Sequence, residues 1–274
     1  MFFVCPKCMG KLNIKDAVAR CDKGHSYDKS RYGYFNLLLS DKGGTHGDNR
    51  EMILARREFL SAGFYEPLAE RISEICSELL EDGGVLLDAG LGEGYYTERI
   101  SRKVADISGV HVAGFDISKD AVRQAAKRLA SADLAVAGSY HMPVESESVD
   151  VLLNTFSPLA IEETRRVIRV GGAFVMAIPG EEHLFGLKSA IYKIPYKNTV
   201  ANTHLDGFNL ISREELKYPL NLNTREDIRS LFMMTPYAYR TSLEDREKVF
   251  SLDSLQTDAH FIILTYRKEK DKWI

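Results

Sequence analysis

The sequence predicts an α/β fold in which a mostly parallel sheet is covered by helices, preceded by a small metal-binding module. Three observations lead to this prediction. A four-ligand pattern, Cys-x2-Cys followed by Cys-x3-His, ends at His25. An apolar run later ends in Asp88 and is followed by glycines at alternate positions. From there to residue 178, short apolar segments alternate with helical patterns, as in a sheet built from strand–helix–strand units.

Residues 1–37 are expected to fold around a metal ion. Cys5 and Cys8 are followed, after twelve residues, by Cys21 and His25. Two tight turns that each present two thiolate or imidazole ligands suit tetrahedral Zn²⁺, and four protein ligands leave no position for a reactive water. We therefore expect a structural zinc, which stabilises a segment too short to fold on an apolar core. The alternative, a redox Cys-x-x-Cys pair, lacks a preceding thioredoxin-like strand.

Basic and aromatic side chains are mixed in the N-terminal part of the chain. Residues 1–50 contain nine Lys or Arg and five Asp, a balance of +4, whereas the whole chain carries −3. Aromatic rings beside basic groups can stack unpaired bases and hold phosphates, which favours RNA as a partner. Two alternatives stay open: the rings can instead form the core of the module, and the basic residues can be a solvated surface.

Residues 38–80 are expected to form a linker and two helices. The polar, glycine-rich stretch 41–48 is typical of a flexible linker. One helix is expected to begin near Asn49. The next should begin with Pro67 in its first turn and carry the fourth cysteine, Cys76, as an ordinary buried thiol.

The apolar run ending in Asp88 predicts a strand, a ligand-binding turn and a helix N-terminus. A dinucleotide fingerprint would place its third glycine where this chain has Tyr95. The spacing Asp-x-Gly-x-Gly-x-Gly, formed by Asp88, Gly90, Gly92 and Gly94, instead resembles motif I of class I S-adenosylmethionine-dependent methyltransferases. A second strand ends 28 residues later in an acid, Asp116, which can accept hydrogen bonds from both ribose hydroxyls of a nucleoside.

The rest of the pattern supports a parallel sheet. Strands are expected at 84–89, 110–116, 133–137, 149–155 and 173–178, with Ser118 capping the helix after the second of them. In a methyltransferase of this type the end of the fourth strand is where the target atom meets the methyl group. Asn154 and Ser157 lie there and are the candidate catalytic residues, although Asn154 can equally be a simple strand-ending residue.

Further segments extend the resemblance along the whole chain. They are Gly33–Leu38, Ala55–Leu60, Gly92–Thr97, Pro179–Leu184 and Met234–Arg240. In this order they resemble the RlmA (RrmA) family of 23S ribosomal RNA guanine-N1 methyltransferases, which includes the macrolide-resistance branch TlrB. The resemblance implies a Rossmann-like class I S-adenosylmethionine-dependent methyltransferase domain with a seven-stranded sheet over residues 81–274. It also implies a zinc-ribbon-like module at residues 1–37.

The resemblance further implies roles for particular residues. Zinc would be bound by Cys5, Cys8, Cys21 and His25. The candidate residues for binding S-adenosyl-L-methionine, from the motifs and the resemblance together, are Tyr65, Asp88, Gly90, Gly92, Glu93, Gly94, Asp116 and His183. The implied substrate is a hairpin in domain II of 23S rRNA, modified at a 745- or 748-type guanine by a homodimer. A methyltransferase acting on a small molecule or protein, and a non-catalytic RNA-binding protein, are the alternatives.

Composition excludes some other classes. Hydrophobic content of 45% and charged content of 27% are ordinary for a globular protein. No run of about 18 apolar residues is present, so we expect no membrane association. The first residues lack the basic region and apolar core of a secretory signal, and a cytoplasmic location is therefore expected.

Overall fold

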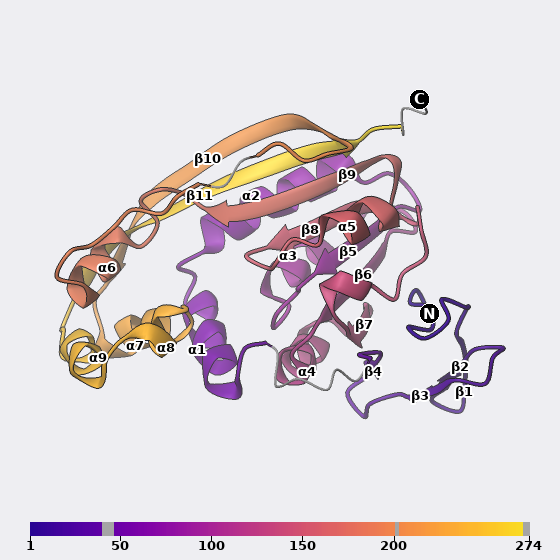
Figure 1. The fold of residues 1–274 in the computed structure, drawn as a ribbon, viewed down its shortest axis with the longest axis horizontal. Helices are drawn as coiled ribbons and strands as arrows, with labels where there is room; N and C mark the ends of the chain where they lie inside the picture. The colour runs from indigo at the N-terminus through magenta and orange to yellow at the C-terminus, as the bar shows by residue number, and fades with distance from the viewer. Residues whose placement is uncertain (40–46, 201–202, 271–274) are drawn as a thin grey trace.

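The computed structural model describes residues 1–39, 47–200 and 203–270, and an eight-stranded sheet runs through its centre (Figure 1). The order across the sheet is β10-β11-β9-β8-β5-β6-β7-β4. The strands are β4 (Phe35–Asn36), β5 (Val85–Ala89), β6 (His111–Asp116), β7 (Asp133–Val136), β8 (Val149–Thr155), β9 (Ile168–Pro179), β10 (Phe208–Leu222) and β11 (Leu255–Lys268). The strands from β9 to β4 are parallel, and β10 and β11 are antiparallel additions at the other edge.

The five predicted parallel strands are confirmed, and β9 begins five residues earlier than expected, at Ile168. Seven of the strands make up the sheet that the resemblance implies. The eighth, β4, was not predicted: it comes from the N-terminal part and pairs with β7, with Phe35 opposite Ala135. Because Leu37 also donates a backbone hydrogen bond to Val136, the N-terminal part is tied directly into the sheet edge.

Helices cover the sheet, whose two faces are both buried. The helices are α1 (Arg50–Ser61), α2 (Glu66–Leu79), α3 (Tyr95–Lys103), α4 (Lys119–Arg128), η1 (Ser139–His141), α5 (Ile161–Val167), α6 (Phe185–Ile191), α7 (Arg225–Met233), α8 (Tyr237–Arg240) and α9 (Leu243–Phe250). Leu86 packs in one apolar cluster and its neighbour Leu87 in another, on the opposite face. Strands covered on both faces need apolar residues at successive positions, which explains the continuous apolar run before Asp88.

The predicted helix starts are confirmed. Asn49 caps α1 by accepting a hydrogen bond from the backbone of Met52, and Ser118 caps α4 in the same way through Ala121. Pro67 lies in the first turn of α2, and Cys76 is fully buried on that helix. Most of the predicted linker 41–48 lies outside the described residues.

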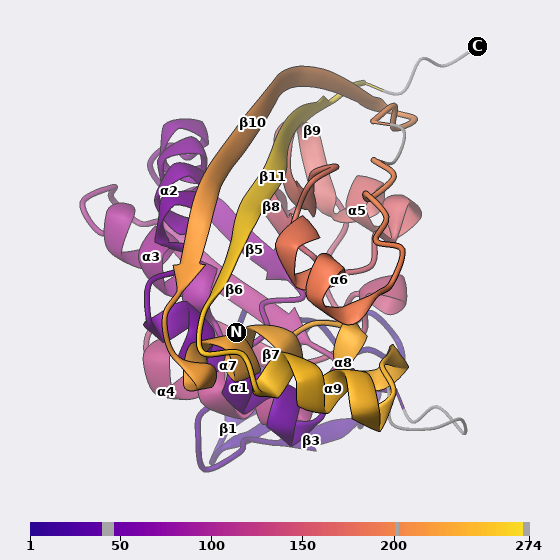
Figure 2. The same ribbon diagram turned by 90° about the vertical axis from the view of Figure 1, so that its left-hand side faces the viewer.

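A group of helices caps the carboxyl ends of the parallel strands. Strands β10 and β11 are joined by α7, α8 and α9 instead of a tight turn. Helix α7 packs against α1, and α9 packs against α6 and α7. Figures 1 and 2 show these helices together beyond the tips of β8 and β9. The cap therefore stands over the edge of the sheet where the candidate site residues were predicted.

The N-terminal module is a small antiparallel sheet docked onto the larger domain. It consists of β1 (Asn13–Lys15), β2 (Val18–Arg20) and β3 (Ser26–Asp28). Val4 donates a backbone hydrogen bond to the carbonyl of Pro143 at 2.8 Å, and His141 contacts the Pro6 carbonyl through Nε2 at 2.9 Å. Phe3 and Leu12 are buried in the same apolar cluster as strands of the main sheet.

Candidate metal centre and active site

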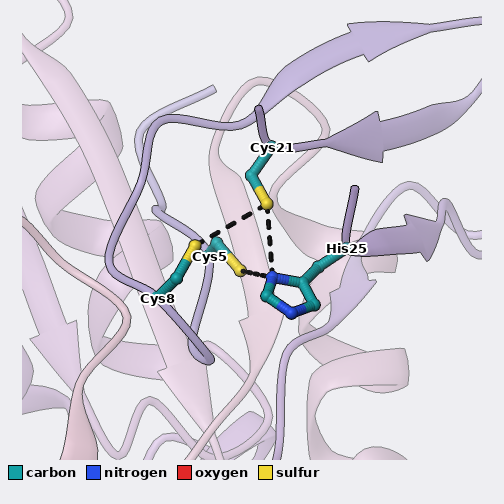
Figure 3. A group of neighbouring side chains, drawn as sticks. All are labelled: Cys5, Cys8, Cys21 and His25. Carbon is teal, nitrogen blue, oxygen red and sulfur yellow. Dashed lines mark hydrogen bonds between the residues drawn. The ribbon is translucent and has the colours of Figure 1, made fainter. Parts of the chain in front are cut away.

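The structure brings the four predicted metal ligands together (Figure 3). Their ligand atoms all lie within 4.8 Å of one another. The Sγ atoms of Cys8 and Cys21 are 3.7 Å apart, and Nδ1 of His25 is 3.3 Å from Sγ of Cys21. Zn–S bonds of about 2.3 Å at tetrahedral angles place neighbouring ligand atoms about 3.8 Å apart. Both the donor set and the spacing fit a closed, structural Zn²⁺ site.

Cys5 is placed to ionise readily. Its thiol is buried, which opposes ionisation, but the Tyr27 hydroxyl lies 3.3 Å from Sγ and the turn supplies backbone N–H groups. Together these hydrogen bonds outweigh burial and lower the pKa of Cys5 to about 6. A thiolate is the form that binds a metal.

The glycine turn after β5 is shaped by its contacts with the end of β6. The backbone N–H of Gly92 donates to Oδ2 of Asp116 at 3.0 Å, and the N–H of Ser118 donates to Oδ1 at 2.7 Å. Gly90 and Gly92 both have positive φ, a conformation that favours glycine. Burial raises the pKa of Asp116, and these two donors oppose that effect. Each carboxylate oxygen keeps a second lone pair, so Asp116 can still accept ribose hydroxyls.

Asp88 is the most isolated charge in the site. Its side chain is buried, with Oδ2 accepting a hydrogen bond from the Thr97 hydroxyl at 2.5 Å. Oδ1 has no partner among the described residues. Burial raises the pKa of Asp88 to about 7, with Thr97 acting in the opposite direction. An unpartnered buried carboxylate oxygen beside a glycine cradle fits a cofactor that carries a positively charged amino group and sulfonium.

Two other motif I residues have clear structural contacts. A Cβ atom on Gly94 would lie 3.0 Å from Leu129 and 3.1 Å from Ala125, so this glycine lets α3 pack closely against α4. The buried Glu93 carboxylate accepts a hydrogen bond from Nε of Arg128 at 2.8 Å. Its other oxygen, Oε1, is buried without a partner in the described part of the chain.

Tyr65 and His183, which are far apart in sequence, meet above the sheet. The Tyr65 hydroxyl lies 3.3 Å from Nε2 of His183. The backbone N–H of His260 donates to Nδ1 of His183 at 3.2 Å, so the neutral ring carries its proton on Nε2 and donates it to Tyr65. Burial lowers the pKa of His183 to about 3, which keeps the ring neutral at physiological pH. The Tyr65 hydroxyl hydrogen is then free to donate.

The end of β8 places the two candidate catalytic residues beside motif I. Asn154 is buried and its Nδ2 donates to the Pro158 carbonyl at 3.4 Å. A Cβ atom on Gly90 would lie 2.2 Å from Oγ of Ser157, so Gly90 is required for Ser157 to lie this close. Between them, Phe156 has a positive φ of 56° and a ring that is 43% exposed.

Two residues near the site were not singled out from sequence. Arg56 on α1 pairs with Asp48, hydrogen-bonds the Met234 carbonyl at 3.4 Å, and lies 4.0 Å from the Cβ position of Gly92. Phe156 lies two residues after Asn154 and directly before Ser157. Arg56 belongs to the Ala55–Leu60 segment that carries the resemblance, but the sequence assigns no role to either residue, because their importance depends on contacts across the fold.

Comparisons with known proteins match this architecture. Residues 3–42 match the family model described as "RlmA, N-terminal", and residues 86–172 match the one described as "Methyltransferase domain". The 23S rRNA (guanine(748)-N(1))-methyltransferase of Streptomyces fradiae is 30% identical over 226 residues, covering 80% of this chain and 79% of the relative. A Micromonospora griseorubida protein named "Putative 23S rRNA (guanine-N(1)-)-methyltransferase" is 32% identical over 260 residues, covering 86% of each.

The chain belongs to the RlmA family of methyltransferases. It is therefore an S-adenosylmethionine-dependent enzyme with a structural zinc, and the predicted class I fold is confirmed. The buried acids and the glycine turn are available to hold the cofactor, which supplies an electrophilic methyl group. Among the described residues, none of the helices has the length and apolar character needed to span a membrane.

Proposed function

We propose that this RlmA-family enzyme methylates N1 of a guanine in 23S rRNA, at a 745- or 748-type position in a domain II hairpin. The observation that carries the proposal is the pairing, in one chain, of the RlmA zinc module with a methyltransferase domain, together with relatives named as 23S rRNA guanine-N1 methyltransferases that align over most of the chain. The basic balance of +4 in residues 1–50 supports a polyanionic substrate.

The reaction makes limited demands on the enzyme. Guanine N1 carries a proton near neutral pH, so its lone pair attacks the methyl group only as that proton leaves. The reaction requires alignment of the two atoms and an acceptor for the proton. We assign the alignment to the polar groups at the end of β8, where Ser157 lies beside Gly90 of motif I and Asn154 is three residues away. Their oxygens and the backbone carbonyls there would accept the hydrogen bond from N1–H, and the proton would leave to water. The cofactor would be held by Tyr65, Asp88, Gly90, Gly92, Glu93, Gly94, Asp116 and His183.

Phe156 is the best candidate to hold the target base. Its ring is partly exposed at the end of β8 and packs on one side against Tyr96 and Phe261, with ring centroids 6.4 and 5.6 Å away. Stacking on an aromatic ring contributes about 1–3 kcal/mol per base in single-stranded recognition. A guanine taken out of its hairpin could therefore lie against this ring, near the methyl group.

The proposal divides the chain by task. Residues 1–37 would form the zinc module that recognises RNA, residues 38–80 the linker and helices that join it to the enzyme, and residues 81–274 the methyl-transfer domain. We propose a homodimer in the cytoplasm as the working form, as the family resemblance implies. The module docks near β7, which keeps it close to the catalytic domain. This supports a single RNA-binding surface formed by the module and the catalytic domain together.

The test is methyl transfer to unmodified 23S rRNA, with N1-methylguanine located by reverse-transcription stops. We expect one stop in the domain II hairpin. Phe156→Ala should lower kcat/KM for RNA about 10- to 100-fold, while Phe156→Tyr, which keeps the ring, should remain within about threefold of wild type. Transfer to no RNA, with cofactor binding intact, would contradict the proposal and favour a small-molecule or protein substrate.

A further inference from the structure

Two arginines and a tyrosine outside the active site converge in an unusual way. Nη2 of Arg31 and Nη2 of Arg123 each donate a hydrogen bond of 2.8 Å to the same atom, the Tyr32 hydroxyl oxygen. Both guanidinium groups also lie over the Tyr32 ring, 4.8 and 4.7 Å from its centroid. The two donating nitrogens are therefore within about 6 Å of each other.

The cluster presents N–H and O–H donors but contains no negatively charged acceptor. The Tyr32 oxygen accepts from both arginines, and its own hydrogen has no acceptor in the described part of the chain. Neither Arg31 nor Arg123 is within 4.0 Å of a carboxylate of any described residue. By contrast, Arg128 on the same helix as Arg123 pairs with Glu93 and Glu98.

Placing two cations this close is unfavourable unless an anion neutralises them. The Tyr32 pKa lies below its ordinary value, chiefly because of the hydrogen bond from Arg31 and with a contribution from Arg123, as expected in a positive local potential. A phosphate group could accept hydrogen bonds from both guanidinium forks and from the hydroxyl. No carboxylate among the described residues takes that place.

The cluster lies where the two functional parts of the chain meet. Arg31 and Tyr32 follow β3 in the N-terminal module, whereas Arg123 is on α4, directly after the Asp116 strand. Tyr34 is buried against Leu91 of the motif I turn and Val122 of α4. Both β4 and α4 pack against β7. An anion held here would touch the zinc module and the catalytic domain together.

We infer that Arg31, Tyr32 and Arg123 form a binding site for a backbone phosphate of the RNA substrate. The inference rests on the proposed function for the nature of the ligand. The site fixes the register of the RNA on the enzyme and reads no base, because it contacts only the phosphodiester. It also requires the module and α4 to keep the arrangement seen here.

The experiment measures binding of a domain II hairpin RNA across a series of salt concentrations. The proteins are the wild type, Arg31→Ala, Arg123→Ala and the double variant, with Lys127→Ala as control. Lys127 is an exposed cation on the same helix whose amine contacts only the side chain of Gln124. We expect the double variant to lose about 5- to 20-fold in affinity and its salt slope to fall by about one, whereas Lys127→Ala stays within about twofold.

Two further readouts separate phosphate binding from a purely structural role. Cofactor affinity and melting temperature should be unchanged in the double variant, and kcat at saturating RNA should be retained while KM rises. Tyr32→Phe, which removes only the hydroxyl, should weaken RNA binding about two- to threefold. If the double variant keeps the wild-type salt slope and RNA affinity, or loses them only together with its melting temperature, the inference is overturned.

Failure of the proposed function gives a different result. A wild-type protein that binds the hairpin through this arginine pair but transfers no methyl group to any RNA would overturn the proposed reaction and leave the phosphate site standing. If the wild type methylates the hairpin and the arginine variants bind RNA as tightly as the wild type does, the phosphate site is overturned and the proposed reaction stands.

Discussion

At the scale of single residues, the candidate cofactor site contains acids that the fold shields from water. Asp116 ends β6 and Asp88 lies one residue before the end of β5, and burial raises the pKa of each. Asp116 is compensated by two backbone N–H groups, whereas Asp88 has one hydroxyl donor and one oxygen without a described partner. The cost of keeping Asp88 charged without its ligand is therefore the larger of the two.

This cost predicts how stability changes with pH. The pKa of Asp88 rises from 3.8 to about 7 on folding, so between about pH 4 and pH 7 the folded state holds a proton that the unfolded state has lost. The free energy of unfolding contributed by Asp88 must then fall as pH rises through this window and level off above it. Asp88→Asn should remove that slope and, without cofactor, stabilise the protein at pH 8 by on the order of 2–4 kcal/mol.

Urea unfolding between pH 4.5 and 8, without cofactor, measures this effect. Asp106→Asn, at an exposed position after α3, is the control and should keep the wild-type slope. With cofactor present the order should reverse, because Asp88→Asn removes the charge that we propose binds the cofactor. Parallel stability curves for the wild type and Asp88→Asn would show that burial of Asp88 costs little.

At the scale of elements, motif I has a structural role: it connects β5 to α3 and lets α3 pack against α4. Gly94 begins α3, packs against α4 and has a φ of 84°. Any side chain there meets both a strained backbone and the neighbouring helix. The requirement for glycine at this position follows from its backbone conformation and from helix packing, without any ligand.

Gly94→Ala should therefore lower the free energy of unfolding more than the same substitution at a glycine with similar backbone strain and open space around it. Gly83 has a φ of 74° and no heavy atom within 4 Å of its Cβ position, so Gly83→Ala reports the backbone cost alone, about 1 kcal/mol. Gly94→Ala should cost about 2–4 kcal/mol, since it adds overpacking against Ala125 and Leu129. Equal losses of the free energy of unfolding in the two variants would argue that α4 moves aside easily.

The elements that were predictable from sequence are those with local signals. The metal ligands, the Asp88 and Asp116 strands and the Ser118 cap are all marked by short-range spacing, and the structure confirms their positions. Strand β4 has only two residues and forms because Phe35 pairs with Ala135 of β7, which is distant in sequence. The pairing of Arg123 with Tyr32 spans 91 residues and has no local signature. The sequence shows that such residues are present, but it does not show which of them meet in the fold.

At the scale of the whole molecule, the N-terminal module and the sheet are parts of one structure. Phe3, Phe35 and Leu37 are buried with strands of the main domain, and β4 extends the main sheet. Deleting residues 1–37 would thus remove β4 and expose the edge of β7, in addition to removing the zinc site. Such a deletion cannot separate RNA recognition from the integrity of the enzyme, and a change confined to the metal is the better probe.

Loss of zinc should abolish activity on RNA while the cofactor site survives. Cys21→Ser removes one ligand from a module whose stability depends on the metal, so we expect loss of bound zinc and a fall of at least about 100-fold in kcat/KM for RNA. The cofactor dissociation constant should change less than about threefold, because the described hydrogen bonds that hold Asp88 and Asp116 come from Thr97, Gly92 and Ser118 of the main domain. Cys76→Ala is the matched control, since Cys76 is a buried thiol on α2 outside the metal cluster, and it should keep one zinc per chain.

Zinc content by mass spectrometry, cofactor calorimetry and methyl transfer to RNA are measured on the same samples. If Cys21→Ser lost its zinc and still methylated RNA normally, the module would be a passive attachment, and RNA recognition would have to come from the catalytic domain alone.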